Sequence, residues 1–155
     1  MVQLIKTIKR HVPENAIYQG RLKKQGCTVK MNEIPNPNLT VDLDKINKVD
    51  DSKNADFLFA SEDDGGWILL IELKKGRPDI SHAIEQLQSA ANLVEKWISS
   101  QDVEHFMGVL VSGGLSRYQS SKLKKMSDRG IRFKGENRKI LRIACGSELK
   151  RVFVL

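Results

Sequence analysis

Hydrophobic and polar residues follow one another along the chain in blocks that predict helices and strands. A long unbroken apolar run, residues 67–71, leads directly into charged residues. A run of this kind is typical of a strand covered on both faces. A second apolar run, residues 57–60, precedes it across the polar, glycine-containing segment 61–66, which is typical of a hairpin turn. The middle of the chain is therefore predicted to form a two-stranded hairpin.

Apolar residues spaced three and four apart predict the helices. The longest predicted helix opens after Pro78 and Asp79, and its apolar positions form one stripe that is expected to cover a sheet. Gly26 is expected to end the second helix, as glycine often does. The predicted helices cover residues 2–12, 14–25, 80–99 and 117–129.

Further short apolar segments predict the remaining strands. A strand that follows the long helix indicates a crossover and a partly parallel sheet. Residues 39–43 fit either an extra strand or a loop, and residues 151–155 fit either a last strand or a tail. The other predicted strands cover residues 27–31, 106–111, 131–134 and 139–145, with a turn at residues 135–137. The 155 residues are predicted to form one α/β domain.

The expected register of the hairpin brings three charged side chains together. With the turn centred at residue 64, Asp56 directly faces Glu72, and Lys74 shares a strand face with Glu72. Two adjacent carboxylates repel unless a cation lies between them, and carboxylate oxygens suit Mg²⁺ or Mn²⁺. The open end of the hairpin is therefore predicted to be a metal site. An ordinary solvated ion pair at the end of a hairpin is the alternative.

This pattern resembles the PD-(D/E)xK nuclease superfamily, which has the restriction-endonuclease-like fold. An acid, a hairpin and then Glu-x-Lys at the end of an apolar strand carry the resemblance. It implies an αβββαβ core with a mixed central sheet flanked by helices. It also implies that Asp56 and Glu72 bind Mg²⁺, with Mn²⁺ as a substitute, and that the carbonyl of Leu73 is a further ligand. Lys74 would orient or activate the attacking water. Ala55 stands where the family often has proline.

Two further residues are supporting candidates. The resemblance gives Glu14, on the predicted second helix, the part of an additional acid near the metal. The alternative is an ordinary first-turn carboxylate, which a helix N-terminus favours. Gln86 lies at the edge of the apolar stripe of the long predicted helix. Several nuclease branches place a glutamine on this helix, where it holds the lysine or a phosphate. The alternative is that Gln86 is a solvated residue at the rim of the stripe. Ala90 stands where some exonuclease branches have tyrosine, so that branch is not assigned.

The acid-x-Lys tripeptide alone has little specificity, because the chain contains it at three places. Asp51-Ser52-Lys53 lies in a polar segment, and Glu148-Leu149-Lys150 follows Gly146 and Ser147. Only the tripeptide that begins at Glu72 stands at the end of a predicted apolar strand, and only this one has a second acid, Asp56, predicted opposite its glutamate.

Positive charge is concentrated near the C-terminus. The formal net charge is +7, and residues 117–151 contain twelve Lys or Arg and three Asp or Glu. The rest of the chain is slightly acidic. A one-sided basic region is expected for a protein that binds a polyanion such as nucleic acid. The alternative is a role in solubility alone.

Other features indicate the cellular compartment and exclude some functions. The chain has no apolar stretch long enough to cross a bilayer and no signal-peptide pattern, so no membrane partner is predicted. Cys27 and Cys145 lack metal-ligand spacing and are expected to be reduced, and with three scattered histidines a zinc site is not predicted. A cytoplasmic location is expected.

These observations together predict a Mg²⁺-dependent nuclease that hydrolyses phosphodiester bonds of nucleic acid, with a DNA endonuclease as the expected form. The preference for DNA comes from the family resemblance. One alternative is a non-catalytic nucleic-acid-binding module with the same fold. Another is a subunit of a larger nuclease assembly. Cutting of both strands would fit a homodimer, although no interface pattern is visible in the sequence.

Overall fold

The antiparallel half of the central sheet is a three-stranded meander with a short strand at its outer edge. The computed structural model describes residues 3–46, 54–98 and 103–154. Residues 39–43, which fitted a strand or a loop, lie almost entirely in a strand of this half. From the edge inwards its strands are β1 (Ile17–Tyr18), β4 (Asn38–Asp42), β5 (Phe57–Ser61) and β6 (Trp67–Lys74).

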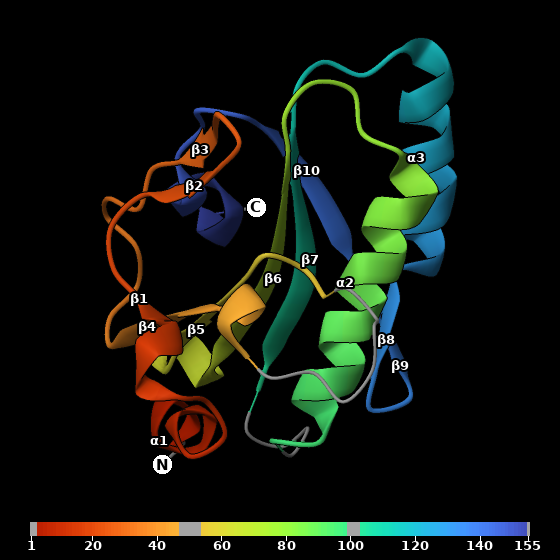
Figure 1. Ribbon diagram of the computed structural model, residues 1–155. Coiled ribbons are helices and arrows are strands. Elements are labelled where there is room, and N and C mark those ends of the chain that lie inside the picture. Colours follow the sequence, from red (N-terminus) through yellow and green to blue (C-terminus); the bar gives the residue numbers. More distant parts are fainter. Residues whose placement is uncertain (1–2, 47–53, 99–102, 155) are drawn as a thin grey trace.

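The other half of the sheet is parallel. β7 (His105–Ser112) runs parallel to β6, and β10 (Ile140–Ala144) runs parallel to β7. α2 (Ile80–Glu95) connects β6 to β7, and α3 (Arg117–Arg129) lies between β7 and β10 in the chain. The strand order is therefore β1-β4-β5-β6-β7-β10 (Figure 1). The predicted α/β class and the mixed sheet are confirmed.

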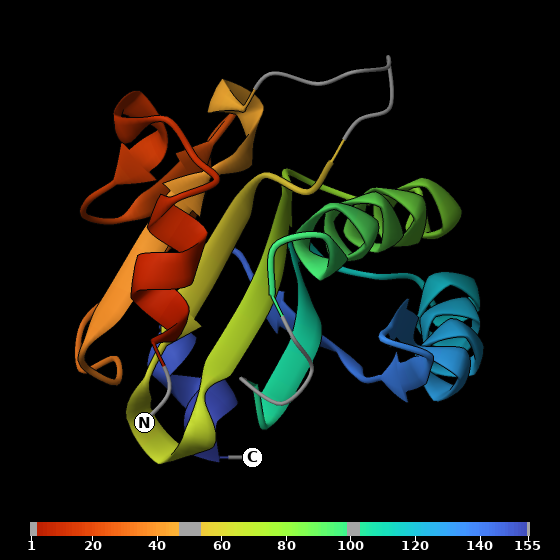
Figure 2. The same ribbon diagram turned by 90° about the horizontal axis from the view of Figure 1, so that it is seen from below.

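Both faces of the sheet are covered, which explains the continuous apolar runs of its central strands. Leu58 and Leu70 pack in one core with the helices, and Phe59 and Ile71 pack in a second core on the other face. Figures 1 and 2 show the helices on one side of β6 and β7. The first face is covered by α1 (Leu4–Lys9), by α2 and α3, and by the hairpin of β8 (Ile131–Phe133) and β9 (Glu136–Arg138). The second face is covered by the hairpin of β2 (Leu22–Lys24) and β3 (Cys27–Val29) and by the 3₁₀ helix η5 (Leu149–Val154).

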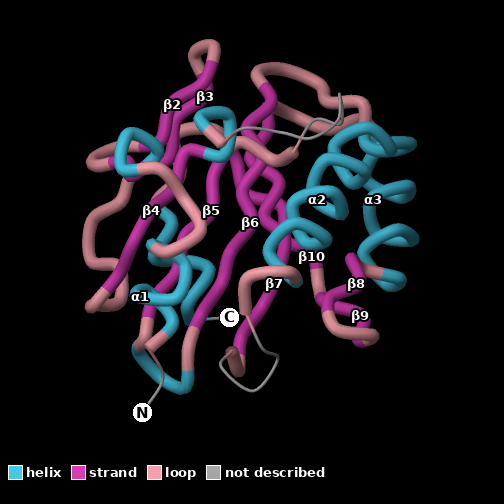
Figure 3. The backbone as a smooth tube through the Cα atoms, turned by 60° about the horizontal axis from the view of Figure 1, so that its bottom comes forward, coloured by secondary structure: helices cyan, strands magenta, loops and turns pink. Residues whose placement is uncertain are grey.

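α2 is the long helix that the apolar stripe predicted. Asp79 caps its N-terminus by accepting the backbone N–H of His82 at 3.1 Å. Most of the stripe is buried against the sheet, and α2 lies beside the β8–β9 hairpin (Figure 3). Within the described parts of the chain, no helix has both the length and the hydrophobicity needed to cross a membrane.

The helix predicted over residues 14–25 is wrong. The segment forms a single 3₁₀ turn, Glu14–Ala16, followed by β1 and β2. Gly20 breaks the segment with a φ of 90°, a conformation that glycine adopts readily. Gln25 and Gly26 have φ values of 50° and 86° and form the turn between β2 and β3, so Gly26 closes a hairpin and does not end a helix.

Three smaller predictions near the chain ends also need correction. The first helix is shorter than residues 2–12, because it spans Leu4–Lys9. The turn predicted at residues 135–137 lies earlier, at Lys134 and Gly135, whose φ values are positive. The described part of residues 151–155 belongs to the 3₁₀ helix η5, so it is neither a strand nor a tail.

Cys27 and Cys145 form a disulfide bond across 118 residues of sequence, so the prediction that they are reduced is wrong. The bond joins the β2–β3 hairpin to the segment after β10. Backbone contacts bring these segments together, because Gly146 N–H donates to the carbonyl of Thr28 at 2.7 Å and Lys30 bridges to Glu148. The expected cytoplasmic location loses the support that reduced cysteines gave it.

Candidate active site

The predicted hairpin register is confirmed and places two carboxylates side by side. Phe57 pairs with Ile71 in the β5–β6 ladder, and the residue before Phe57, Asp56, therefore lies opposite Glu72. Both carboxylate side chains are almost completely buried on the face of the sheet that α2 covers. They lie at the carboxyl end of β6, where ligands of open α/β sheets commonly bind.

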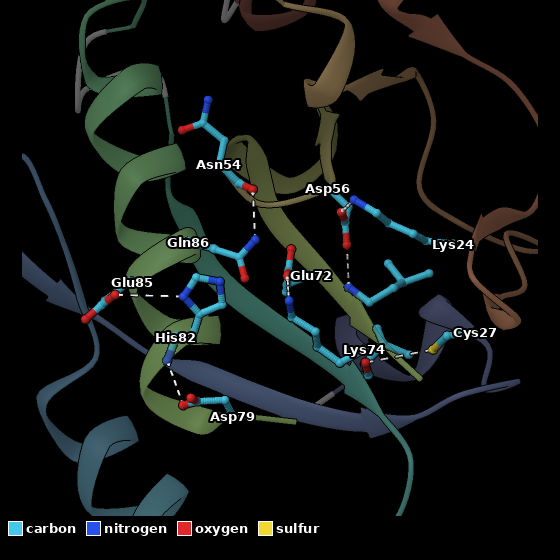
Figure 4. Close-up of polar contacts among 12 residues, drawn as sticks. Lys24, Cys27, Asn54, Asp56, Glu72, Lys74, Asp79, His82, Glu85 and Gln86 are labelled. Carbon is cyan, nitrogen blue, oxygen red and sulfur yellow. Dashed lines mark hydrogen bonds and ion pairs between the residues drawn. The ribbon is translucent and has the colours of Figure 1, made fainter. Parts of the chain in front are cut away.

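Lys74 completes the group of charges that the sequence predicted. Its Nζ lies 3.0 Å from Glu72 Oε2, and its side chain is 28% exposed. Asp56 Oδ2 accepts the backbone N–H of Leu73 at 2.8 Å, which ties the start of β5 to the end of β6. The structure therefore brings Asp56, Glu72, Leu73 and Lys74 together at one end of the sheet (Figure 4).

Within the described parts of the chain, two buried oxygen atoms in this region have no hydrogen-bond partner. They are Glu72 Oε1 and Gln86 Oε1, whose side chains lie next to each other in Figure 4. A buried carboxylate oxygen without a donor costs free energy, so it is expected to meet a ligand. The adjacent pocket has a volume of about 330 Å³ and is lined by Lys24, Gln25, Asp44, Asn54, Glu72, Leu73, Lys74, His82 and Gln86.

The environment of Glu72 favours the protonated carboxyl group. Burial, which penalises the charged form, raises the pKa of Glu72 to about 8, and the negative charge of Asp56 adds to the shift. The ion pair with Lys74 acts in the opposite direction but is weaker. A positive ion beside the two carboxylates would reverse this balance.

Lys24 and Asp44 are site residues that the sequence reasoning missed. Lys24, on β2, reaches the pocket from the opposite face of the sheet, and its Nζ contacts Asp56 Oδ1 and lies 3.0 Å from Asp44 Oδ2. Burial lowers the pKa of Lys24, but the hydrogen bonds and charges of Asp56 and Asp44 outweigh burial and raise it above the ordinary value. Asp44 also lines the pocket.

The first turns of α2 contribute two more polar side chains. Gln86 is 6% exposed, so it is not a solvated rim residue, and its Nε2 lies 3.5 Å from the carbonyl of Asn54. His82 also lines the pocket. His82 and Gln86 both reach the pocket because residues four positions apart lie on the same side of a helix. The short connection from β6 to α2 brings that side to the ends of β5 and β6.

The 3₁₀ turn that carries Glu14 lies next to the 3₁₀ turn Leu43–Lys45, which carries Asp44. Glu14 is exposed in the 3₁₀ turn Glu14–Ala16 and does not line the pocket of Glu72. The helix on which the resemblance placed it does not form.

The carboxylates of Glu72, which lines the pocket, and of its neighbour Asp56 are of the type that hard divalent cations take as ligands. Asp56 and Glu72 provide carboxylate oxygens, and Glu72 Oε1 has no hydrogen-bond partner among the described residues. Mg²⁺ requires few protein ligands, because it usually retains several waters. Among the described residues, no group of three or more His, Cys, Asp or Glu side chains is arranged to hold a metal. The candidate ligand set is therefore the two carboxylates together with the main chain of Leu73.

Exposed positive side chains lie in the connections that follow the carboxyl ends of β6 and β7. Lys75 and Arg77 are exposed in the connection that follows β6, and Arg117 is exposed at the start of α3. The loop that follows β7 lies against this connection, because Gly113 N–H donates to the carbonyl of Gly76 at 3.0 Å. The loop itself is held by Arg142, which donates to the carbonyl of Gly113 at 2.7 Å.

Comparison with the profiles of known protein families, with curated proteins and with solved structures found no match. A function for this chain therefore has to be argued from its residues and their geometry.

Proposed function

We propose that the protein is a Mg²⁺-dependent nuclease that hydrolyses phosphodiester bonds of nucleic acid, with DNA as the expected substrate and endonucleolytic cutting as the expected mode. One observation carries the proposal. Asp56 and Glu72 lie side by side with Lys74 next to them, and Glu72 Oε1, which is buried beside a polar pocket, has no hydrogen-bond partner in the described part of the chain.

The arrangement of elements supports this proposal. The order α1, β4, β5, β6, α2, β7 corresponds to the αβββαβ core of the restriction-endonuclease-like fold that the sequence resembles. Asp56 directly precedes β5 and Glu72 lies on β6, so the two carboxylates belong to the hairpin that carries the resemblance. Likeness of fold does not fix function, so the site carries more weight than the topology.

Each site residue has a chemical task in this proposal. Asp56, Glu72 and the Leu73 carbonyl would hold the ion, which supplies Lewis acidity and lowers the pKa of bound water. Lys74 is placed to orient the attacking water and to neutralise charge that develops on the phosphate. Gln86 has an unpaired carbonyl oxygen with which it can accept a hydrogen bond from that water or from Lys74.

The exposed basic side chains support a polyanionic substrate. Lys75 and Arg77 are exposed in the connection that follows β6, Arg117 is exposed at the start of α3, and the wider excess of basic residues lies in segment 117–151. Contacts between such side chains and phosphates supply most non-specific affinity for nucleic acid and weaken as salt rises.

The test is a time course of cutting with supercoiled plasmid and with linear single-stranded and double-stranded DNA, in Mg²⁺, Mn²⁺ or EDTA. Lys74→Ala and Glu72→Gln should lower the rate by at least about a hundredfold, because a transition-state electrostatic contact is typically worth that much. Glu148→Gln is the matched control for Glu72→Gln, since it alters a Glu-Leu-Lys tripeptide that does not line the pocket, at an ion pair of 3.5 Å with Lys150. This control should retain the wild-type rate.

The same experiment separates the alternatives. Absence of cutting, together with salt-sensitive DNA binding that is unchanged in Lys74→Ala, would overturn the nuclease proposal and indicate a non-catalytic binding module. Cutting that appears only after a partner is added would indicate a subunit of a larger assembly. The mass of the protein in solution would show whether it forms a homodimer.

A further inference from the structure

The ammonium group of Lys24 already lies where Asp56 would meet a cation. Its Nζ contacts Asp56 Oδ1, while Asp56 Oδ2 accepts the N–H of Leu73. Both oxygens of Asp56 are therefore engaged by groups of the protein. A divalent ion at Asp56 Oδ1 would lie within a few ångströms of the ammonium group, and two positive charges at that distance repel strongly in a buried site.

Asp44 offers Lys24 a second carboxylate within the same pocket. Asp44 Oδ2 is 3.0 Å from Lys24 Nζ, and its side chain is 48% exposed, compared with 2% for Asp56. The side chain of Lys24 is itself 37% exposed and has a flexible four-carbon stem. Lys24 can therefore leave Asp56 and remain paired with Asp44 without a change in β2.

We propose that Lys24 is an internal cation that occupies the metal position of the unloaded site and moves to Asp44 when a divalent cation is bound. This inference rests on the proposed function, because it takes Asp56 as a metal ligand. The role of Lys24 is to compensate the charge of the buried Asp56 carboxylate while no ion is present, since a buried charge without a partner is costly. The affinity for the ion is then lowered by the cost of moving Lys24.

The experiment measures binding of Mn²⁺ and Mg²⁺ by isothermal titration calorimetry, without nucleic acid. Lys24→Met retains the length of the side chain and removes its charge. It should bind Mn²⁺ about tenfold more tightly than the wild type, which is the effect expected when one charge-assisted hydrogen bond no longer has to be broken. Lys23→Met is the matched control, because Lys23 is exposed on the same strand and its loss changes the net charge equally. Its affinity should remain within about twofold of the wild type.

A second variant distinguishes movement of Lys24 from Asp56 to Asp44 from general damage to the fold. Asp44→Asn removes the carboxylate to which Lys24 moves, so it should weaken Mn²⁺ binding in the wild-type background. Its effect should be clearly smaller when combined with Lys24→Met, because no ammonium group then needs a new partner. General damage to the pocket would weaken binding in both single variants.

Equal or weaker Mn²⁺ binding by Lys24→Met, with wild-type binding intact, would overturn this inference and leave the nuclease proposal standing. Metal-dependent cutting that is lost in Lys74→Ala supports the nuclease proposal independently of Lys24. A wild-type protein that neither binds Mn²⁺ nor cuts DNA would overturn both.

Discussion

The buried carboxyl group of Glu72 determines how the site responds to pH. Burial and the charge of Asp56 raise its pKa in the folded protein to about 8, from an ordinary value of 4.5. The folded state therefore retains a proton that the unfolded chain releases between these two values. Because the folded state binds more protons there, its stability must fall as the pH rises through this range. The contribution of Glu72 therefore makes the ion-free protein least stable above pH 8.

The first prediction at this scale concerns the melting temperature of the ion-free protein. In EDTA, the wild type should lose stability between about pH 5 and about pH 9 relative to Glu72→Gln, because the glutamine does not titrate. Thermal unfolding of both proteins over this range measures the difference. Parallel pH profiles of the two melting temperatures would show that the pKa of Glu72 is not raised in the folded protein. Addition of Mg²⁺ should stabilise the wild type most at the alkaline end, where the carboxylate is ready to bind.

The sequence was sufficient to predict some residues of the site but not others. Asp56 and Glu72 could be paired because the period of a strand and the centre of a hairpin turn fix which residues face each other. Lys24 and Asp44 come from a separate hairpin and from the 3₁₀ turn Leu43–Lys45. No periodic pattern links such segments to β6, so only their packing in three dimensions shows the contact.

At the scale of elements, the connections that follow β6 and β7 hold the site end of the sheet together. A β-carbon added at Gly113 would lie 2.9 Å from both the Cα and the carbonyl oxygen of Gly76. These are backbone atoms, which cannot move aside as a flexible side chain would. Gly113 therefore permits the close approach of the two connections, and this approach positions the segment between Lys74 and α2.

The second prediction uses two neighbouring glycines. Gly113→Ala should destabilise the protein by about 1–3 kcal/mol, the typical cost of inserting a methyl group into a packed region. Gly114→Ala is the matched control, because a β-carbon there would have no atom within 4 Å. Urea unfolding measures both. Equal stability of the two variants would show that the connections can separate without cost.

Long elements were predicted from the sequence more accurately than short ones. α2 and α3 show a helical period over several turns, and α3 was predicted with its observed bounds, Arg117–Arg129. Segment 14–25 also has apolar residues at helical spacing, yet it forms strands of two and three residues. Such strands are too short to show an alternation, and tertiary contacts decided their structure.

At the scale of the whole molecule, the disulfide connects the first and last parts of the chain. Cys27 and Cys145 lie in the core that covers the face of the sheet opposite the helices. The order of helices and strands was enough to predict a mixed α/β sheet, because a crossover helix implies parallel strands. The disulfide was not predictable, since two cysteines 118 residues apart carry no spacing signal.

The third prediction concerns removal of this bond. Cys27→Ser combined with Cys145→Ser should lower the free energy of unfolding by about 2–5 kcal/mol, because the unfolded chain gains freedom when a long loop is opened. Urea unfolding of the oxidised wild type, the reduced wild type and the double variant measures the change. A reductant should lower the midpoint of the wild type but leave that of the double variant unaltered. A wild-type midpoint that does not respond to the reductant would contradict the prediction.

The disulfide also makes the chain a closed covalent ring with two tails. Residues 28–144 lie inside the ring, and the segments before Cys27 and after Cys145 lie outside it. A protease that cuts the backbone once within the ring leaves both fragments joined through sulfur. The cut protein therefore migrates as one species on a non-reducing gel and separates into two only after reduction, whereas a cut in either tail releases a peptide at once.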